Sequence, residues 1–547
     1  MRPVPRLLLL ALLFAAAASW AAGCKTIQVT TETPLGKVMP GVAMESVVVS
    51  PDGRHVACEA ARGEKRVVVA DGVEIGEYDK IFEESLRFSP DSRHFLFAAR
   101  RGDRRMVVID GVEGKPYDAL GVKDFIFSPD SRHVAYRAIL GGKWFIVFDG
   151  KEGPKYDGIP DGLLVFSADP KRFAYVAHRG EHYCLVIDGV ERGSYDQANQ
   201  KGLKFSPDGL RWAAEMRRGG KELVVVDGVD GNRYEHVGHV FFSPRGGRYA
   251  YVAINGRKQA AVIDGVEGKW YDGVAEGQPV FSPDGLHYAY IASCEGKRLV
   301  VFDGAEGPPY DTIGKGTPCF SPDGSRMAYR AWRNNRITMV VDGEPGRWYE
   351  TLNEGPPTFS PDGRRCVYGA QPEEETVVVL DGVEGRSWRA AGYFVFSPDS
   401  QRLAYQAWRN KETMLTVVDG VEGPDFDGIA GNVVFSPDSK RVAYAAERGG
   451  KHVLVLDGAE QKSAGGLNEP CDGVRNLAFS PDSRHVAYGA KVGEKHTYVV
   501  DGVRGALYDD FPRASAVAFD GPSRVRAVFV KDGRFVLVTV EFRLALG

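Results

Sequence analysis

Short hydrophobic runs separated by turn signals recur along almost the whole chain. In one clear copy a strand ends at Phe281, Ser-Pro-Asp-Gly follows at 282–285, and an alternating apolar run comes next. A later run, 299–302, ends in Asp303-Gly, and Tyr310-Asp lies on the strand after it. Ser-Pro-Asp-Gly suits a type I turn that ends in a left-handed glycine, and Asp-Gly is a strong signal for a tight hairpin. The pattern predicts four antiparallel strands with no helix between them.

This unit repeats with a nearly constant period. Its marker positions run from Ser50 to Asp520 in twelve steps of about 39 residues, at Ser50, Ser89, Ser128, Ser167, Ser206, Ser243, Ser282, Ser321, Ser360, Ser397, Ser436, Ser480 and Asp520. A recurring four-stranded antiparallel unit is typical of a propeller blade. We therefore expect an all-β tandem β-propeller of about 13 four-stranded blades.

The number of blades exceeds the four to eight that propellers usually have per ring. We therefore expect two consecutive rings, of six and seven blades in either order, at residues 46–295 and 296–547. One oversized ring is the alternative. Residues 24–45 form a linker in which 26–32 has the alternating, β-branched pattern of a strand. This strand could complete the last repeat, which has only three predicted strands.

Residues 1–23 have the layout of a secretory signal, with Arg2 and Arg6 ahead of an apolar run at 7–18. The segment ends in Ala-Ala-Gly-Cys24, which resembles a bacterial lipobox and implies lipidation of Cys24. Ordinary cleavage near Ala21 is the alternative. An uncleaved anchor is disfavoured because the apolar run is shorter than a membrane span needs.

Composition changes this picture little. Charged residues make up 26% and hydrophobic residues 43% of the chain, as in ordinary folded proteins. The net charge of −4 gives no electrostatic argument for binding nucleic acid. The cysteines after Cys24 show no CxxC spacing and lie mostly in apolar strand patterns, so we expect buried free thiols.

The repeated strand, Ser-Pro-Asp-Gly turn and Val/Ile-Ala-Tyr run resemble the TolB-type, WD40-like (PD40) propeller repeats over roughly residues 45–545. The resemblance implies the propeller fold. Members of this group include the periplasmic partner of the Tol–Pal envelope system and the gating propellers of prolyl-oligopeptidase-like enzymes. This chain departs from both because it has no additional folded domain and about twice the usual number of blades.

The many aspartates do not indicate catalysis, because one residue needed by every blade is explained by the blade. They suit turn positions, where a carboxylate accepts backbone N–H bonds. Hydrolase, zinc-protease and Walker signatures are absent from the sequence, and so is the spacing of a calcium loop. We predict no catalytic residues, no metal and no cofactor.

The Ser-Pro-Asp and Asp-Gly turns are expected at one end of the blades, and the remaining loops at the other end. We therefore predict an acidic rim on one face of the propeller and a basic rim on the opposite face. The loops between the second and third strands of the blades are rich in Lys and Arg, as at Arg100, Arg101, Arg217 and Arg218. Our hypothesis is that this basic rim meets an anionic surface such as lipid headgroups, envelope polysaccharide or an acidic protein patch. The alternative is that these charges serve solubility.

Two loops combine an aromatic ring, a guanidinium and an amide, a set suited to stacking on a sugar or holding a peptide. They comprise Trp332, Arg333 and Asn334 in one repeat and Trp408, Arg409 and Asn410 in another. The alternative is that each Trp packs against the end of its own strand.

These features favour a noncatalytic binding or assembly scaffold of the cell envelope, exported as a periplasmic, outer-membrane or cell-surface lipoprotein of a bacterium. The expected partner is an envelope protein or an anionic polysaccharide, with the membrane reached through a lipid on Cys24 and no nucleic acid bound. The alternative is an envelope enzyme on the same fold, such as a glycosidase or lyase, whose site would be built from several blades.

Overall fold

The computed structural model describes residues 26–37, 42, 46–121, 125–161, 164–168, 172–199, 202–274, 279–316, 318–461, 471–512 and 515–544. The predicted signal peptide at 1–23 and the predicted lipidation site Cys24 lie outside these residues. In the described part of the chain, no helix is long and apolar enough to cross a membrane.

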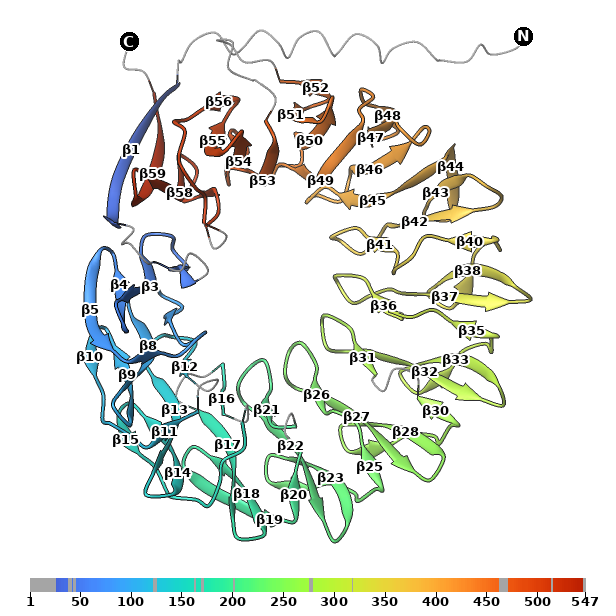
Figure 1. Ribbon diagram of the computed structural model, residues 1–547. Helices are drawn as coiled ribbons and strands as arrows, with labels where there is room; N and C mark the ends of the chain where they lie inside the picture. The colour runs from blue at the N-terminus through green and yellow to red at the C-terminus, as the bar shows by residue number, and fades with distance from the viewer. Residues whose placement is uncertain are drawn as a thin grey trace, which may run out of the picture.

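Thirteen small antiparallel sheets, which we call blades and number in chain order, are arranged around one ring (Figure 1). Blade 13 packs on blade 1 through a cluster that includes Val56, Val67, Val528 and Phe535. The expectation of two consecutive rings, divided near residue 295, is therefore corrected, because all thirteen blades belong to one oversized ring. The blade period is a property of the local sequence, whereas the number of blades per ring depends on how neighbouring blades pack.

Two middle strands carry most of the pairing in each blade. The first is, in order, β3 (Val56–Arg62), β8 (Phe95–Arg101), β13 (Val134–Leu140), β17 (Phe173–Arg179), β22 (Trp212–Arg218), β27 (Tyr249–Asn255), β32 (Tyr288–Cys294), β37 (Met327–Arg333), β42 (Cys366–Gln371), β46 (Leu403–Trp408), β50 (Val442–Arg448), β54 (Val486–Val492) and β58 (Arg524–Lys531). The second is β4 (Lys65–Ala70), β9 (Arg104–Ile109), β14 (Lys143–Phe148), β18 (His182–Ile187), β23 (Lys221–Val226), β28 (Lys258–Ile263), β33 (Lys297–Phe302), β38 (Arg336–Val341), β43 (Thr376–Leu380), β47 (Met414–Val418), β51 (Lys451–Leu456), β55 (Lys495–Val500) and β59 (Arg534–Leu544).

The edge strands are shorter than the sequence pattern suggests. In blade 2, β6 (Lys80–Ile81) and β7 (Arg87–Phe88) both pair with β8, and β10 (Val112–Glu113) pairs with β9. The predicted return loop therefore contributes the first half of a split edge strand. In blades 10 to 12 the two halves are continuous, as β45 (Ala390–Phe396), β49 (Gly428–Phe435) and β53 (Gly473–Phe479), each with a register shift.

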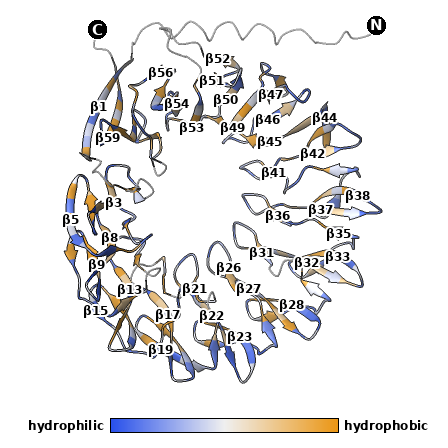
Figure 2. Cartoon of the chain, viewed as in Figure 1, coloured by the Kyte–Doolittle hydropathy of each residue, from blue (hydrophilic) through white to orange (hydrophobic). Residues whose placement is uncertain are grey.

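The two repeat turns have the geometry that their residues predict. Gly285 of Ser-Pro-Asp-Gly has a φ of 74°, which an L side chain adopts only with strain. Asp303 and Gly304 have φ values of 46° and 86°, two left-handed residues in succession, as a type I′ hairpin requires. The strands on either side then alternate between faces that pack on the two neighbouring blades. Figure 2 shows hydrophobic residues following the strands through the blades.

The strand at 26–32 closes the ring. β1 (Thr26–Lys37) pairs antiparallel with β59, with Thr31 opposite Thr539, and takes the edge position that β10 has in blade 2. It supplies the strand that the last repeat lacks. Segments from the two ends of the sequence therefore share blade 13 (Figure 1).

Candidate functional site

The Ser-Pro-Asp turns are held by their own side chains. In blade 3 the Ser128 hydroxyl donates to Asp130 Oδ1 over 2.6 Å and accepts from the backbone N–H of His133 over 2.9 Å. This serine is fully buried. The hydrogen bond from Ser128 is the main cause that holds the pKa of Asp130 below its ordinary value. The repeated aspartates therefore stabilise the turns that contain them.

The Asp-Gly aspartates have a similar internal role. Asp149 Oδ1 accepts from the backbone N–H of Val134 over 3.0 Å, and its Oδ2 lies 2.6 Å from His133 Nδ1. Arginine replaces histidine in other copies, as in the 2.8 Å contact of Arg211 Nε with Asp227. The histidines that follow the turn pair with an aspartate of the neighbouring hairpin, and His133 also stacks on Phe148 at 5.2 Å.

The basic rim is largely neutralised within the blades. Arg101 donates to both carboxylate oxygens of Glu113, over 2.7 and 2.9 Å, and Arg218 forms an ion pair with Asp230. The bond from Arg101 lowers the pKa of Glu113. Tyr78 of the preceding blade donates to the same Glu113 over 3.1 Å, so this carboxylate also joins two blades. Two of the four predicted rim arginines therefore have structural partners.

The other two rim arginines differ. Arg217 Nη1 donates to Gln197 Oε1 over 3.3 Å. The Arg100 side chain makes no hydrogen bond or ion pair with any described residue, and Arg100 lies directly opposite Lys80 on β6 and Arg105 on β9. Like charges directly opposite on neighbouring strands are destabilising. The register thus places three cations side by side on blade 2.

The two Trp loops are not brought together, because Trp332 lies in blade 8 and Trp408 in blade 10. Trp332 packs beside the buried core of blades 8 and 9, near Leu352. The Trp408 ring lies 6.3 Å from that of Tyr393, which is 61% exposed. Packing therefore explains Trp332, while Trp408 stands beside an exposed aromatic ring.

The polar residues of these loops mostly have internal partners. Arg333 lies over the Tyr310 ring at 4.9 Å, and the Asn334 backbone N–H donates to Asp311 over 2.7 Å. Arg409 pairs with Glu422 and contacts Asp425, and Asn410 Oδ1 accepts from a backbone N–H within its own turn. Both guanidinium groups are thus engaged within the chain, and ligand binding by these two loops stays a prediction.

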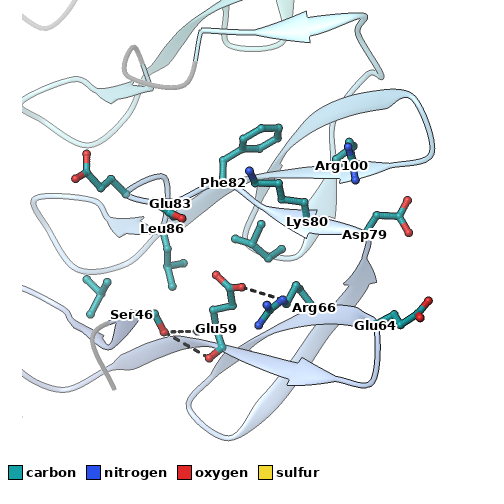
Figure 3. Close-up of a pocket in the computed structure, with 13 residues that line it drawn as sticks. Ser46, Glu59, Glu64, Arg66, Asp79, Lys80, Phe82, Glu83, Leu86 and Arg100 are labelled. Atoms are coloured by element: carbon teal, nitrogen blue, oxygen red, sulfur yellow. Dashed lines mark hydrogen bonds and ion pairs between the residues drawn. The ribbon is translucent and has the colours of Figure 1, made fainter. Parts of the chain in front are cut away.

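A pocket of about 750 Å³ opens between blades 1 and 2, and several of the side chains that line it do not repeat. We call it the seam pocket. Figure 3 shows groups of both signs around it, with lining residues that include Glu59, Arg66, Lys80, Phe82, Glu83 and Arg100. Such a pocket can bind a ligand that carries a charged group beside an apolar one.

Glu59 is the unusual residue of the seam pocket. It comes from the middle of β3, where its side chain is 21% exposed, and it lies 3.6 Å from Arg66. No described residue donates a hydrogen bond to its carboxylate. Burial raises the pKa of Glu59, the charges of Arg66 and Lys80 oppose that rise, and the charge of Glu83 adds to it. Glu59 is thus a carboxylate whose charge its surroundings do not fully compensate.

Sequence reasoning missed Glu59 and Glu83. The available signal was a charged residue inside an apolar strand run, at a position where most repeats carry a small or apolar residue. Of the described residues, no group of three or more His, Cys, Asp or Glu side chains is placed to hold a metal ion. The cysteines after Cys24 are free, and burial raises the pKa of Cys58 to about 11.

Comparison with known proteins finds only distant structural similarity. No protein-family model and no curated protein sequence matches the chain. Similar solved structures include a eukaryotic initiation factor (13% identity, TM-score 0.30, covering 67% of this chain and 94% of that one). TolB from Acinetobacter baumannii (14%, 0.22, 62% and 79%) and the Cps50 (Swd1) β-propeller domain from Myceliophteria thermophila (14%, 0.21, 50% and 99%) are further examples. These are distant likenesses to TolB and WD40-type propellers, and the propeller fold itself rests on the thirteen blades of this chain.

Proposed function

We propose that the protein is a noncatalytic binding or assembly scaffold of the cell envelope. The observation that carries this proposal is a difference between the polar side chains of the repeat and those of the seam pocket. Polar side chains of the repeat are bonded to each other within and between blades, whereas several side chains that do not repeat, such as Glu59 and Glu83, line the seam pocket. In repeat proteins the repeated framework supplies rigidity and the variable positions supply specificity.

The proposal includes export, with Cys24 lipidated as the mature N-terminus, and an envelope protein or anionic polysaccharide as the partner. It rests on the charged leader, its apolar run and the Ala-Ala-Gly-Cys ending. Mass spectrometry of the mature N-terminal peptide tests it. A diacylglyceryl mass on Cys24 supports the anchor, and an unmodified N-terminus that starts before Cys24 contradicts it.

Binding is tested by cosedimentation of the mature protein with the envelope fraction of its source organism at low salt. We expect much less of the double variant Lys80→Glu, Arg100→Glu than of the wild type to cosediment, because the variant reverses two charges of the seam pocket. Arg257→Glu is the matched control, since Arg257 lies exposed in the corresponding loop of blade 6. Equal retention of the double variant and the wild type would contradict a role for this pocket.

The seam pocket also favours the second candidate, an envelope glycosidase or lyase. Glycoside hydrolysis uses two carboxyl groups, one of which needs a raised pKa to act as the acid. Glu59, with its raised pKa and Glu83 nearby, has that character. Release of reducing ends from purified envelope polysaccharide, abolished by Glu59→Gln, would support the enzyme. Binding of the polysaccharide without release of reducing ends would support the scaffold.

A further inference from the structure

One position faces the next blade from the middle of each first long strand. It lies nine residues after the marker serine, and we call it the seam position. In most blades it is small or apolar, as with Val176, Val252 and Ile291, which join the hydrophobic clusters between blades. It is polar in five blades, at Glu59, Arg137, Glu215, Arg330 and Gln406.

In blades 3 and 5 the following blade supplies a partner for this polar side chain. Arg137 donates to the Ile159 carbonyl and forms an ion pair with Asp161. Glu215, only 2% exposed, accepts from the backbone N–H of Val240 over 2.8 Å and lies 3.1 Å from His239 Nδ1. A buried charge requires compensation of this kind.

Blades 8 and 10 follow the same rule. Arg330 donates to the Asn353 carbonyl over 3.2 Å, and the charge of Glu354 favours its protonated form. Gln406 Nε2 donates to the Gly431 carbonyl over 2.7 Å. The residue that faces the seam position always lies in the segment that leads into the following blade.

Strand register identifies the facing residue in every case. The first edge strand of the following blade pairs one residue with its first long strand, such as Lys80 with Arg100 or His236 with Ile254. The facing residue comes three positions later, and in the five cases it is Glu83, Asp161, His239, Glu354 and Gly431. Blades 3, 5 and 8 thus set opposite charges, or an acid and a histidine, against each other.

Blade 1 breaks this rule because Glu59 faces Glu83. Both side chains are acidic, and the charge of Glu83 disfavours the ionised form of Glu59. The seam pocket, about 750 Å³ in volume, occupies the place where the other blades make their contact. Arg66, at 3.6 Å, is too distant to donate a hydrogen bond to Glu59. Among the described residues, no cationic group hydrogen-bonds Glu59, whereas Arg137 and His239 make such contacts in blades 3 and 5.

We propose that Glu59 and Glu83 hold the guanidinium or ammonium group of a basic side chain from a protein partner. This group would contact Glu59 as His239 contacts Glu215 in blade 5, and Glu83 as Arg137 contacts Asp161 in blade 3. Guanidinium binds carboxylates through paired, charge-assisted hydrogen bonds. The pocket is larger than one side chain, and its lining cations Lys80 and Arg100 suit a carbonyl or carboxylate beside the basic residue. The inference rests on the proposed scaffold function and names its partner class as a peptide segment.

The test uses the whole mature protein and a defined probe, the peptide acetyl-Gly-Arg-Gly-amide, observed by saturation-transfer NMR. The citrulline peptide of the same shape is the uncharged comparison. We expect transfer to the arginine peptide and at least fivefold weaker binding of the citrulline peptide. Glu59→Gln and Glu83→Gln should each weaken arginine binding several-fold, whereas Glu64→Gln, which removes a charge from the same pocket lining, should not. Equal binding of the two peptides, or no effect of either glutamine variant, would overturn the proposal.

A second variant distinguishes loss of the binding site from misfolding of the protein. Glu83→Arg should recreate the contact of blade 3 with the charges exchanged, so that peptide binding is lost while the midpoint of thermal unfolding rises. Loss of binding with a lower midpoint would contradict the proposal that a basic group is favoured between Glu59 and position 83. If neither glutamine variant weakens peptide binding while the wild type still cosediments with envelope material, only this inference fails. If the peptide binds normally and envelope material does not, the proposed function fails instead.

Discussion

At the residue scale, the pKa values of acidic side chains in this protein shift in opposite directions, depending on what surrounds each side chain. Asp130 is one of many turn aspartates whose pKa is lowered by hydrogen bonds to the ionised form, here chiefly from Ser128. The pKa of Glu59 is raised, because burial and Glu83 outweigh Arg66 and Lys80. A carboxylate stabilises the fold in the first setting and opposes it in the second.

Replacing Glu59 tests this difference through pH dependence. Because the folded-state pKa is raised, ionisation of Glu59 costs stability as pH rises through that value, and this cost is absent below its ordinary value of 4.5. We therefore expect Glu59→Gln to raise the thermal midpoint by about 1 °C at pH 7.5. The gain should shrink towards zero at pH 4, as followed by differential scanning fluorimetry. A gain that does not change with pH would point to packing instead of charge.

At the element scale, β1 closes blade 13 with the same chemistry that joins the other blades. Glu32 of β1 accepts from Tyr508 over 2.9 Å and from Lys531 over 2.6 Å. Glu113 accepts from Tyr78 and Arg101 in the same arrangement. The closing strand thus provides the missing edge and also the carboxylate that a repeat would have carried there.

A cross-link tests the register of this closure. Thr31 lies directly opposite Thr539, so Thr31→Cys with Thr539→Cys should form a disulfide, because opposite residues of antiparallel strands are close enough. Such a bond is expected to add about 2–4 kcal/mol to the free energy of unfolding. Non-reducing electrophoresis and intact mass detect it. Thr31→Cys with Glu541→Cys is two residues out of register and should remain reduced; efficient bonding of that pair would show a different register.

At the scale of the whole molecule, stability is spread over many equivalent carboxylates. The pKa is lowered at aspartates of the Ser-Pro-Asp turns, chiefly by hydrogen bonds from the marker serine in most copies, and at aspartates that directly follow the tyrosine of the repeat, chiefly by bonds from lysine. Examples are Asp91, Asp284, Asp362 and Asp438 in the first set and Asp157, Asp272, Asp311 and Asp509 in the second. Ionised carboxylates therefore stabilise many of the described blades.

This distribution predicts that acid weakens the whole ring. A lowered folded-state pKa contributes stability that is complete above the ordinary aspartate value of 3.8 and is lost as pH falls through the lower, folded value. We expect the thermal midpoint to fall steeply between pH 4 and pH 2 in a transition shared by all blades. Circular dichroism measured across this range checks it, and an unchanged midpoint at pH 2.5 would contradict the assigned role of these aspartates.

Much of the fold could be predicted because its causes are local. Ser-Pro-Asp-Gly and Asp-Gly specify turns through the conformations that their residues adopt, and the alternating runs between them specify strands. The candidate site was harder to predict. Arg101 and Trp332 looked available in the sequence, yet Glu113 and the packing near Leu352 engage them. Their partners lie in other strands, and the repeat pattern does not show which side chains meet.

The sequence by itself determined the blade, the number of its copies and the closing strand, because hairpin turns and strand faces depend on residues close together in the chain. Only the tertiary structure decided that thirteen blades share one ring and that Glu59 faces Glu83 across a pocket. Both depend on contacts between blades, where the angle of packing and the identity of a facing residue are set by two repeats at once. The contacts of a residue that departs from the repeat pattern, such as Glu59, depend on which residue of the following blade faces it.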